Sequence, residues 1–245
     1  MIVIVGDTRD DVLYFERVLA NKDQKTILDR FKVSFGTIFS EKVMVVRDMA
    51  ASILASSVLT HIFDNYTIDL VIGVGKCVAV SNALKPGNIA VSTNVIDADI
   101  DLSILKDVGM NEIPGFEREY KAEDEIVEYL SENLNKRPNV DFFRSTFISS
   151  DNMSKDMINF LKEHKTMYGK TDDKFVVDHN SAGIALPCLL HKIPFVIAKV
   201  VENGFDQPSN LRTYTNVLDR YIDLGKGITE TISNIGRSDV VDEDE

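Results

Sequence analysis

The segment from Phe175 to Gly204, FVVDHNSAGIALPCLLHKIPFVIAKVVENG, constrains the fold more than any other part of the chain. It reads as a strand, a polar turn, an apolar helix, a short loop and a second buried strand. The polar groups Asp178–Asn180 and Glu202–Asn203 follow the two strands. Open α/β sheets bind ligands at such an edge. The alternative is ordinary helix capping at Asn180 or Ser181 and a solvated end of the second strand.

Strand and helix patterns alternate along the rest of the chain. Further strands are expected at Met1–Val5, Thr26–Leu28, Phe31–Phe39, Lys42–Val46, Asp69–Gly75, Ile89–Ser92 and Asp141–Ser149. Helices are expected at Asp7–Leu19, Met49–Phe63, Ala122–Leu134, Lys155–His164 and Asn210–Ile235, with a long functional loop over Asn94–Glu119. This order predicts a single-domain, three-layer α/β/α fold with a central mixed sheet over residues 1–236, followed by an acidic tail at 237–245.

Composition limits where the protein acts and what it binds. The 245 residues are 44% hydrophobic, but no apolar run approaches the ~20 residues that a membrane helix needs. The first residues, MIVIVG, lack the basic flank of a signal peptide. A net charge of −12 disfavours nucleic acid. We therefore expect a cytoplasmic protein that binds a small molecule and has neither a membrane nor a nucleic-acid partner.

Cysteines and histidines give no sign of a disulfide or a metal site. Cys77 and Cys188 are the only cysteines, and both lie in apolar surroundings, as expected for core residues in a reducing compartment. The histidines lack the spacing of metal ligands; they are His61, His164, His179 and His191. No metal and no cofactor are expected.

The loop Gly73–Cys77, GVGKC, follows a buried strand and invites comparison with phosphate-binding loops. A P-loop needs glycine where Leu70 stands and Ser or Thr where Cys77 stands, and a dinucleotide fingerprint needs glycine at Val78. The glycines instead permit close backbone approach to a ligand, or a tight turn. Lys76 either extends its ammonium group to water or meets an anion.

Two further polar groups stand at strand ends. Ser149–Asp151 could hold a nucleophile, but a helix N-cap at Ser150 or Asp151 fits better because no G-x-S-x-G motif is present. Asp10 and Asp11 open the first helix, where carboxylates suit the helix dipole. One of these two aspartates is alternatively a catalytic base.

Taken together, these segments resemble the nucleoside phosphorylase and nucleosidase superfamily. The similarity rests on MIVIVGDTRDDV, on LVIGVG followed by ALKPGNIAVSTNVIDADID, on IPGF, on FISSDNMSKD and on DHNSAGIALPCLLHKIPFVIAKVVEN. Their order is most similar to that of methylthioadenosine/S-adenosylhomocysteine nucleosidases, from Met1 to about Ile235. The resemblance implies a phosphorylase/hydrolase-like fold and a homodimer.

The resemblance also implies roles for particular residues. Asp11 matches the family's glutamate that activates the attacking water, and Asn203 matches the aspartate that protonates the purine. Asn180 matches the glutamate that binds the ribose hydroxyls, and His179 matches a methionine packed under the sugar. Met153 falls at an aromatic position that stacks on the base.

Lys76 lies in a loop that is built of small residues in the family. The departures from the family are therefore concentrated in the site. His179 and Lys76 add cationic potential that would suit an anionic ligand. Asn203 cannot donate a catalytic proton, although its amide can bond a base edge. Futalosine hydrolases are similar in having asparagine there.

Two functions follow as hypotheses. The first is a hydrolase of the nucleosidase or phosphorylase class that cleaves the N-glycosidic bond of a purine or modified nucleoside, weakly on the usual family substrates. In it Asp11 is the base, Asn203 orients the leaving group, and Lys76, Met153, His179 and Asn180 bind substrate. The alternative is a catalytically impaired protein of the same fold that binds a nucleoside-like or anionic ligand or serves in an assembly.

Overall fold

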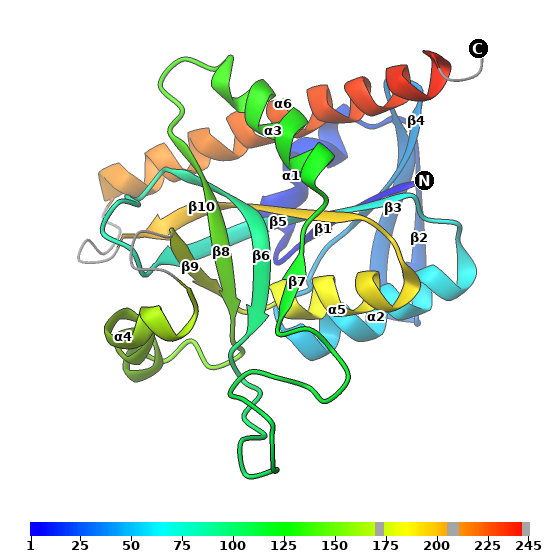
Figure 1. The fold of residues 1–245 in the computed structure, drawn as a ribbon. Helices are drawn as coiled ribbons and strands as arrows, with labels where there is room; N and C mark the ends of the chain where they lie inside the picture. Colours follow the sequence, from blue (N-terminus) through cyan, green and yellow to red (C-terminus); the bar gives the residue numbers. More distant parts are fainter. Residues whose placement is uncertain (170–173, 205–210, 242–245) are drawn as a thin grey trace.

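One mixed sheet with helices on both faces forms the fold in the computed structural model, which describes residues 1–169, 174–204 and 211–241 (Figure 1). The strands are β1 Ile2–Gly6, β2 Ala20–Ile27, β3 Phe31–Ile38, β4 Glu41–Val46, β5 Leu70–Ala79, β6 Ile89–Asp97, β7 Glu119–Lys121, β8 Phe142–Ser149, β9 Phe175–Asp178 and β10 Phe195–Asn203. The helices are α1 Arg9–Val18, α2 Ser52–Asn65, α3 Asp124–Asn135, α4 Lys155–His164, α5 Ser181–His191 and α6 Leu211–Val241, with a 3₁₀ turn at Lys165–Met167.

The sheet is partly closed on itself. β5 pairs in parallel with β1 and β10, and it also pairs with β9 through its last residues. Pairings β10–β6, β6–β8 and β8–β9 complete a ring of five strands, while β4, β3 and β2 extend the sheet beyond β1. The central strands are continuous apolar runs because both of their faces are covered.

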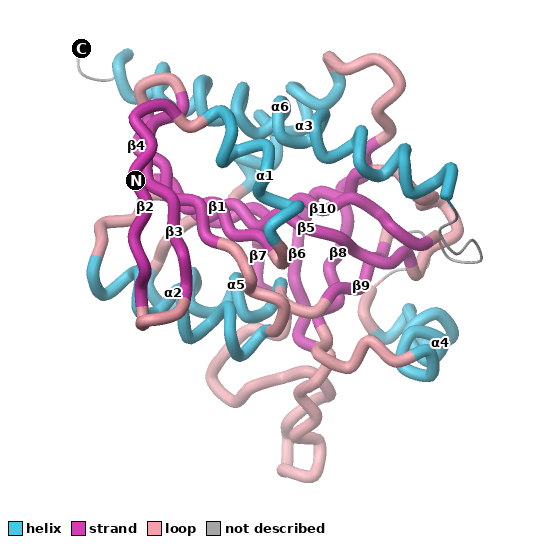
Figure 2. Tube along the Cα trace, turned by 180° about the vertical axis from the view of Figure 1, so that it is seen from behind, coloured by secondary structure: helices cyan, strands magenta, loops and turns pink. Residues whose placement is uncertain are grey.

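The helices form the outer two layers. Helices α1, α3 and α6 lie on one face, and α2 and α5 pack together on the other (Figures 1 and 2). The predicted three-layer α/β/α architecture with a mixed sheet is confirmed. No helix in the described part of the chain is long and apolar enough to cross a membrane.

Some element ends differ from the predictions. β5 continues four residues past Gly75 to Ala79, and β6 continues to Asp97, because pairing with β10, β9 and β8 extends these strands. The loop over 98–118 hangs below the sheet in Figure 1. α6 continues to Val241, and the last four residues of the predicted tail lie outside the described residues.

The predicted N-cap at Ser150 or Asp151 is wrong. Ser154 Oγ instead accepts from Met157 N at 3.2 Å at the start of α4. The hydroxyl of Ser150 donates to Asp99 at 2.6 Å. Asp151 Oδ1 accepts from Ser52 N at 2.9 Å, so this carboxylate caps α2, a helix far away in the sequence. Tertiary contacts therefore decide where these side chains bond.

Candidate active site

A cavity of about 250 Å³ lies where β1, β5, β9 and β10 deliver polar side chains to one place. Its wall consists of Asp7, Thr8, Asp11, Lys76, Cys77, Val78, Met153, His179 and Glu202. Four of the six residues proposed from the sequence are among them, namely Asp11, Lys76, Met153 and His179. Asn180 and Asn203 are not in this wall.

Asp11 has one fixed carboxylate oxygen and one available oxygen. Its Oδ2 accepts hydrogen bonds from Thr8 N and Thr8 Oγ1, both at 2.7 Å. Thr8 precedes α1 and Asp11 stands in its first turn, so the contact also caps the helix. Oδ1 is buried and has no hydrogen-bond partner among the described residues. The helix-terminal position of Asp11 is confirmed, and its role as a base stays a prediction.

Lys199 is the centre of a buried charge network that the sequence analysis missed. It is 0% exposed, and its Nζ lies 3.0 Å from both carboxylate oxygens of Asp7 and 2.7 Å from Asp178 Oδ2. It also donates to Asn180 Oδ1 at 2.6 Å. Burial opposes the charge, but Asp178 and Asp7 together raise the pKa of Lys199, so it remains an ammonium ion.

Asp7 joins this network to the cavity. Burial raises the pKa of Asp7, and the charges of Lys199 and His179 act against that rise. Its carboxylate fits because residue 75 is glycine: a Cβ on Gly75 would lie 2.3 Å from Asp7 Oδ2. The glycine loop after the buried strand therefore makes room for a carboxylate of the protein itself, which sequence motifs for phosphate binding do not describe.

Asn180 lies behind the cavity wall. Its Nδ2 donates to Asp7 Oδ1 at 2.6 Å and to the Met49 carbonyl at 2.7 Å, and the side chain is fully buried. It stands at the N-cap position of α5 but makes no side-chain cap. Asp178 does so instead, accepting from Ser181 N at 3.2 Å and from the Ser181 hydroxyl.

The remaining predicted residues differ in their surroundings. His179 is 28% exposed; its Nε2 lies 3.6 Å from Asp7 Oδ2 and has no hydrogen bond within the described part of the chain. Lys76 meets the Glu202 carboxylate at 3.6 Å, so the anion beside it comes from the protein. Met153 packs against a small apolar cluster. Asn203 ends β10, paired with Val78.

Tyr221 brings a hydroxyl from α6 to the same region. Tyr221 is buried, and its Oη meets the criteria for a hydrogen bond with none of the described residues. Burial raises the pKa of Tyr221, and the nearby Asp11 carboxylate raises it further, so the phenol stays protonated. No sequence signal marks this tyrosine, because it stands within an ordinary amphipathic helix.

The charges around the cavity sum to a negative value. Asp7, Asp11, Asp178 and Glu202 contribute four carboxylates, and Lys76 and Lys199 contribute two ammonium groups. The cationic potential expected from Lys76 and His179 is therefore outweighed. A neutral or cationic ligand suits this site better than an anion.

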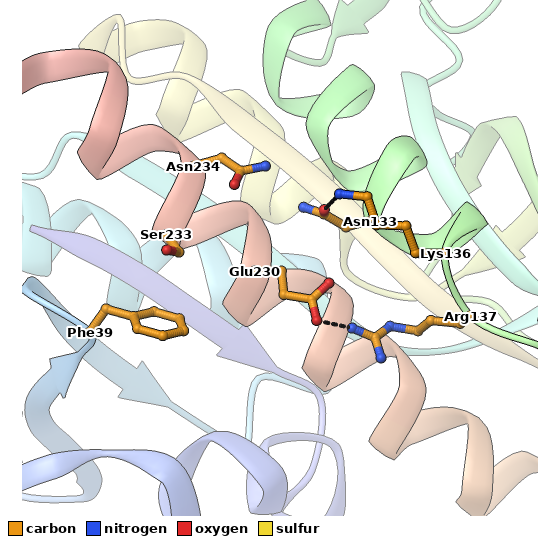
Figure 3. A pocket seen from close by; sticks show the side chains of 7 residues that line it. All are labelled: Phe39, Asn133, Lys136, Arg137, Glu230, Ser233 and Asn234. Carbon is orange, nitrogen blue, oxygen red and sulfur yellow. Dashed lines mark hydrogen bonds and ion pairs between the residues drawn. The ribbon is translucent and has the colours of Figure 1, made fainter. Parts of the chain in front are cut away.

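Two larger hollows lie elsewhere. One, of about 390 Å³, is bounded by α3, α6 and the Phe39 ring, and its Arg137 guanidinium pairs with Glu230 at 2.6 Å (Figure 3). The other is an apolar groove of about 590 Å³ between α1 and α6. Neither combines several carboxylates with a lysine and a histidine, as the smaller cavity does, so chemistry rather than size identifies the candidate active site.

The fold and the cavity define an α/β protein with a polar cavity at the ends of its central strands. A family model described as the phosphorylase superfamily matches residues 1–233. The chain belongs to the phosphorylase superfamily, which confirms the resemblance seen in the sequence. In the part of the chain that the structure describes, no group of three or more His, Cys, Asp or Glu could hold a metal ion.

Particular relatives are similar over most of their length. The chain is 22% identical over 208 residues to a 5'-methylthioadenosine/S-adenosylhomocysteine nucleosidase of an Exiguobacterium species, covering 85% of this chain and 87% of the relative. The crystal structure of the Neisseria meningitidis nucleosidase with methylthio-immucillin-A has a TM-score of 0.83 at 15% identity, covering 95% and 98% of the chains. Futalosine hydrolase of Helicobacter pylori reaches 0.80 at 15% identity, covering 95% and 97%.

Proposed function

We propose that the protein hydrolyses the N-glycosidic bond of a purine or related modified nucleoside. The observation that carries this proposal is Asp11 in the cavity wall, whose Oδ2 is fixed by Thr8 while its buried Oδ1 meets no hydrogen-bond geometry among the described residues. A carboxylate held in this way can accept a proton from water without first losing a protein hydrogen bond. The similar proteins named as nucleosidases and as a futalosine hydrolase support the same chemistry.

In the proposed reaction, Asp11 removes a proton from water as the water oxygen bonds to the anomeric carbon. The carbon–nitrogen bond breaks, and its electron pair leaves with the base. The base takes up a proton from solvent, because Asn203, which matches the family's acid, cannot donate one and is not in the cavity wall. Losing a general acid commonly costs about 10²–10⁴-fold in rate. We therefore expect weak turnover of nucleosides whose base must be protonated to leave.

Water rather than phosphate is the proposed acceptor. The bond breaks through an oxocarbenium-like state that carries positive charge. Four carboxylates against two ammonium groups stabilise that charge and repel inorganic phosphate. Phosphorolysis would require the opposite charge balance at the anomeric carbon.

The test is base release from methylthioadenosine, adenosine, inosine and futalosine-type nucleosides, with and without phosphate. We expect phosphate-independent turnover that falls about 10²–10⁴-fold in Asp11→Asn. The control is Asp10→Asn, which removes the exposed neighbouring carboxylate and should leave the rate within about twofold. Complete absence of turnover in the wild type would instead favour the catalytically impaired binding protein.

We also propose a cytoplasmic homodimer. The free, buried cysteines Cys77 and Cys188 suit a reducing compartment. Large apolar side chains are exposed on α2, α5 and the 98–118 loop, on one side of the sheet (Figure 1). Ile53 is 75% exposed, Leu190 58% and Ile104 94%. Sedimentation should give twice the 27.4 kDa chain mass, and Ile53→Lys should shift it to the monomer.

A further inference from the structure

A hollow between α3, α6 and the β3–β4 hairpin has no part in the reaction proposed above. Its volume of about 390 Å³ is that of a small-molecule site. β1 and β4 run in parallel, with Val5 paired to Val46. Asp7 follows the end of β1, whereas Phe39, which lines the hollow, precedes the start of β4. The hollow therefore lies at the opposite end of these strands from the candidate active site, and the two share no lining residue.

Phe39 holds a position in the hairpin turn where an aromatic residue is unfavourable. Ile38 pairs with Glu41, so Phe39 and Ser40 form a two-residue turn. The φ angle of Phe39 is 53°, in the left-handed region. Glycine, asparagine or aspartate is favoured at such a position, and a bulky residue there is an outlier. The Phe39 side chain is 66% exposed, so core packing does not account for it. The ring instead forms part of the wall of the hollow and points toward α6 (Figure 3).

Lys136 presents an ammonium group at the end of α3. It donates to Asn133 Oδ1 at 2.8 Å. Asn133 in turn donates to Thr231 Oγ1 at 3.1 Å, so the partner of the lysine is fixed between α3 and α6. Among the residues that the structure describes, no carboxylate pairs with Lys136. An ammonium ion has three donors, so two of them remain for a ligand or for water.

Arg137 adds a second cation to the same wall. Its Nη2 pairs with Glu230 at 2.6 Å. Its Nε is buried and has no hydrogen-bond partner in the described part of the chain. A buried donor without a partner calls for an explanation, and an anionic group beside the guanidinium supplies one. The Glu230 side chain is 45% exposed, so its carboxylate can change rotamer when an anion enters.

We propose that this hollow binds a small ligand that combines a flat aromatic ring with one anionic group. The ring stacks on Phe39, and the anion, a carboxylate or a phosphate, lies beside Lys136 and Arg137. These two cations outnumber the single carboxylate of Glu230, although the whole chain has a net charge of −12. The excess of one positive charge matches one anionic group. The inference does not depend on the proposed hydrolysis, because it concerns a separate site.

The experiment measures the affinity of the full chain for four probes by calorimetry and ligand-observed NMR. Adenosine 5'-monophosphate and indole-3-carboxylate each join an aromatic ring to one anionic group, a phosphate in the first and a carboxylate in the second. Indole and inorganic phosphate each carry one half of that chemistry. We expect at least one of the two joined probes to bind about 10- to 100-fold more tightly than either half, because stacking and a charge-assisted hydrogen bond then act together.

Two variants separate the ring from the charge. Phe39→Gly removes the ring and places the favoured residue in the turn, so it should weaken the joined probe about tenfold without lowering the unfolding midpoint in urea. Lys136→Gln should weaken the same probe about tenfold and leave indole unchanged. Phe160→Ala, at an exposed aromatic residue of α4, and Lys76→Met, in the smaller cavity, are the matched controls and should keep the wild-type affinity.

The outcomes either support the site or overturn it. A preference for the phosphate probe or for the carboxylate probe, lost in both Phe39→Gly and Lys136→Gln, supports it and identifies the anion. If neither joined probe binds more tightly than its halves, the inference is overturned. An equal loss in Lys76→Met would place the probe in the smaller cavity and overturn it as well. Cations at the end of a helix also suit its dipole. If Lys136→Gln lowers stability and leaves binding unchanged, that is the role of Lys136 and the inference fails.

Discussion

Asp178 and Asp11 are two buried aspartates with different surroundings: Asp178 is the last residue of β9, and Asp11 stands in the first turn of α1. Asp178 accepts from Ser181 N, the Ser181 hydroxyl and Lys199. Asp11 uses one oxygen for Thr8 and leaves the other buried without a partner in the described residues. Asp11 thus brings an unbonded carboxylate oxygen to the cavity wall, whereas the hydrogen bonds of Asp178 are made within the protein.

The difference shows what each aspartate contributes. A buried carboxylate with all its hydrogen bonds made by the protein holds structure, and removing its partners is costly. A buried carboxylate oxygen without a hydrogen bond lowers the stability of the protein. A ligand or water that reaches this oxygen supplies the missing hydrogen bond. Asp7 combines both cases, since one oxygen is saturated by Asn180 and Lys199 and the other faces His179.

The largest predicted effect tests the buried ion pairs that Lys199 makes with Asp7 and Asp178. Lys199→Met leaves Asp7 and Asp178 buried without their shared ammonium, and breaking a buried ion pair in this way costs about 3–5 kcal/mol. The free energy of unfolding, from urea denaturation, should fall by that amount. Lys76→Met is the matched control, because its pair with Glu202 is partly exposed at 3.6 Å, and it should cost less than about 1 kcal/mol. Equal losses of unfolding free energy in Lys199→Met and Lys76→Met would contradict the distinction between the buried and the partly exposed ion pair.

A smaller effect is expected from Gly75→Ala. The added methyl would meet Asp7 Oδ2 at 2.3 Å, and overpacking of this kind costs about 1–3 kcal/mol. Because the clash is with the carboxylate itself, the same change should cost less in an Asp7→Ala background. A double-mutant cycle of unfolding free energies measures the coupling. Additive losses would show that the methyl clashes with something other than Asp7.

The fold was predictable from the sequence because buried strands and amphipathic helices have their own periods. The cavity was predictable in part, since strand ends meet at one edge and brought Asp11, Lys76, Met153 and His179 together. The Lys199 network was not predictable from the sequence, because its partner Asp7 lies 192 residues away along the chain. A lysine inside the apolar run FVIAKVV implies a buried carboxylate but does not say which one.

The sequence also could not predict in which direction the side chains at the strand ends point. His179 and Asn180 are adjacent, yet His179 lines the cavity and Asn180 bonds Asp7 and the Met49 carbonyl behind it. Family resemblance assigned both to the ligand. The direction of the Asn180 side chain depends on its hydrogen bond to Asp7, and these two residues lie far apart in the sequence.

The smallest predicted effect concerns Tyr221, which lies beside Asp11. Tyr221→Phe removes a buried hydroxyl that lacks hydrogen-bond geometry to the described residues but lies beside Asp11. Without ligand, stability should change by less than about 1 kcal/mol, because no satisfied bond is lost. If the hydroxyl helps to hold the attacking water against Asp11 Oδ1, kcat should fall about five- to tenfold. Tyr14→Phe, in the outer groove that Tyr221 also lines, is the control. A stability loss in Tyr221→Phe with unchanged kcat would place this tyrosine with the structural groups around Asp178.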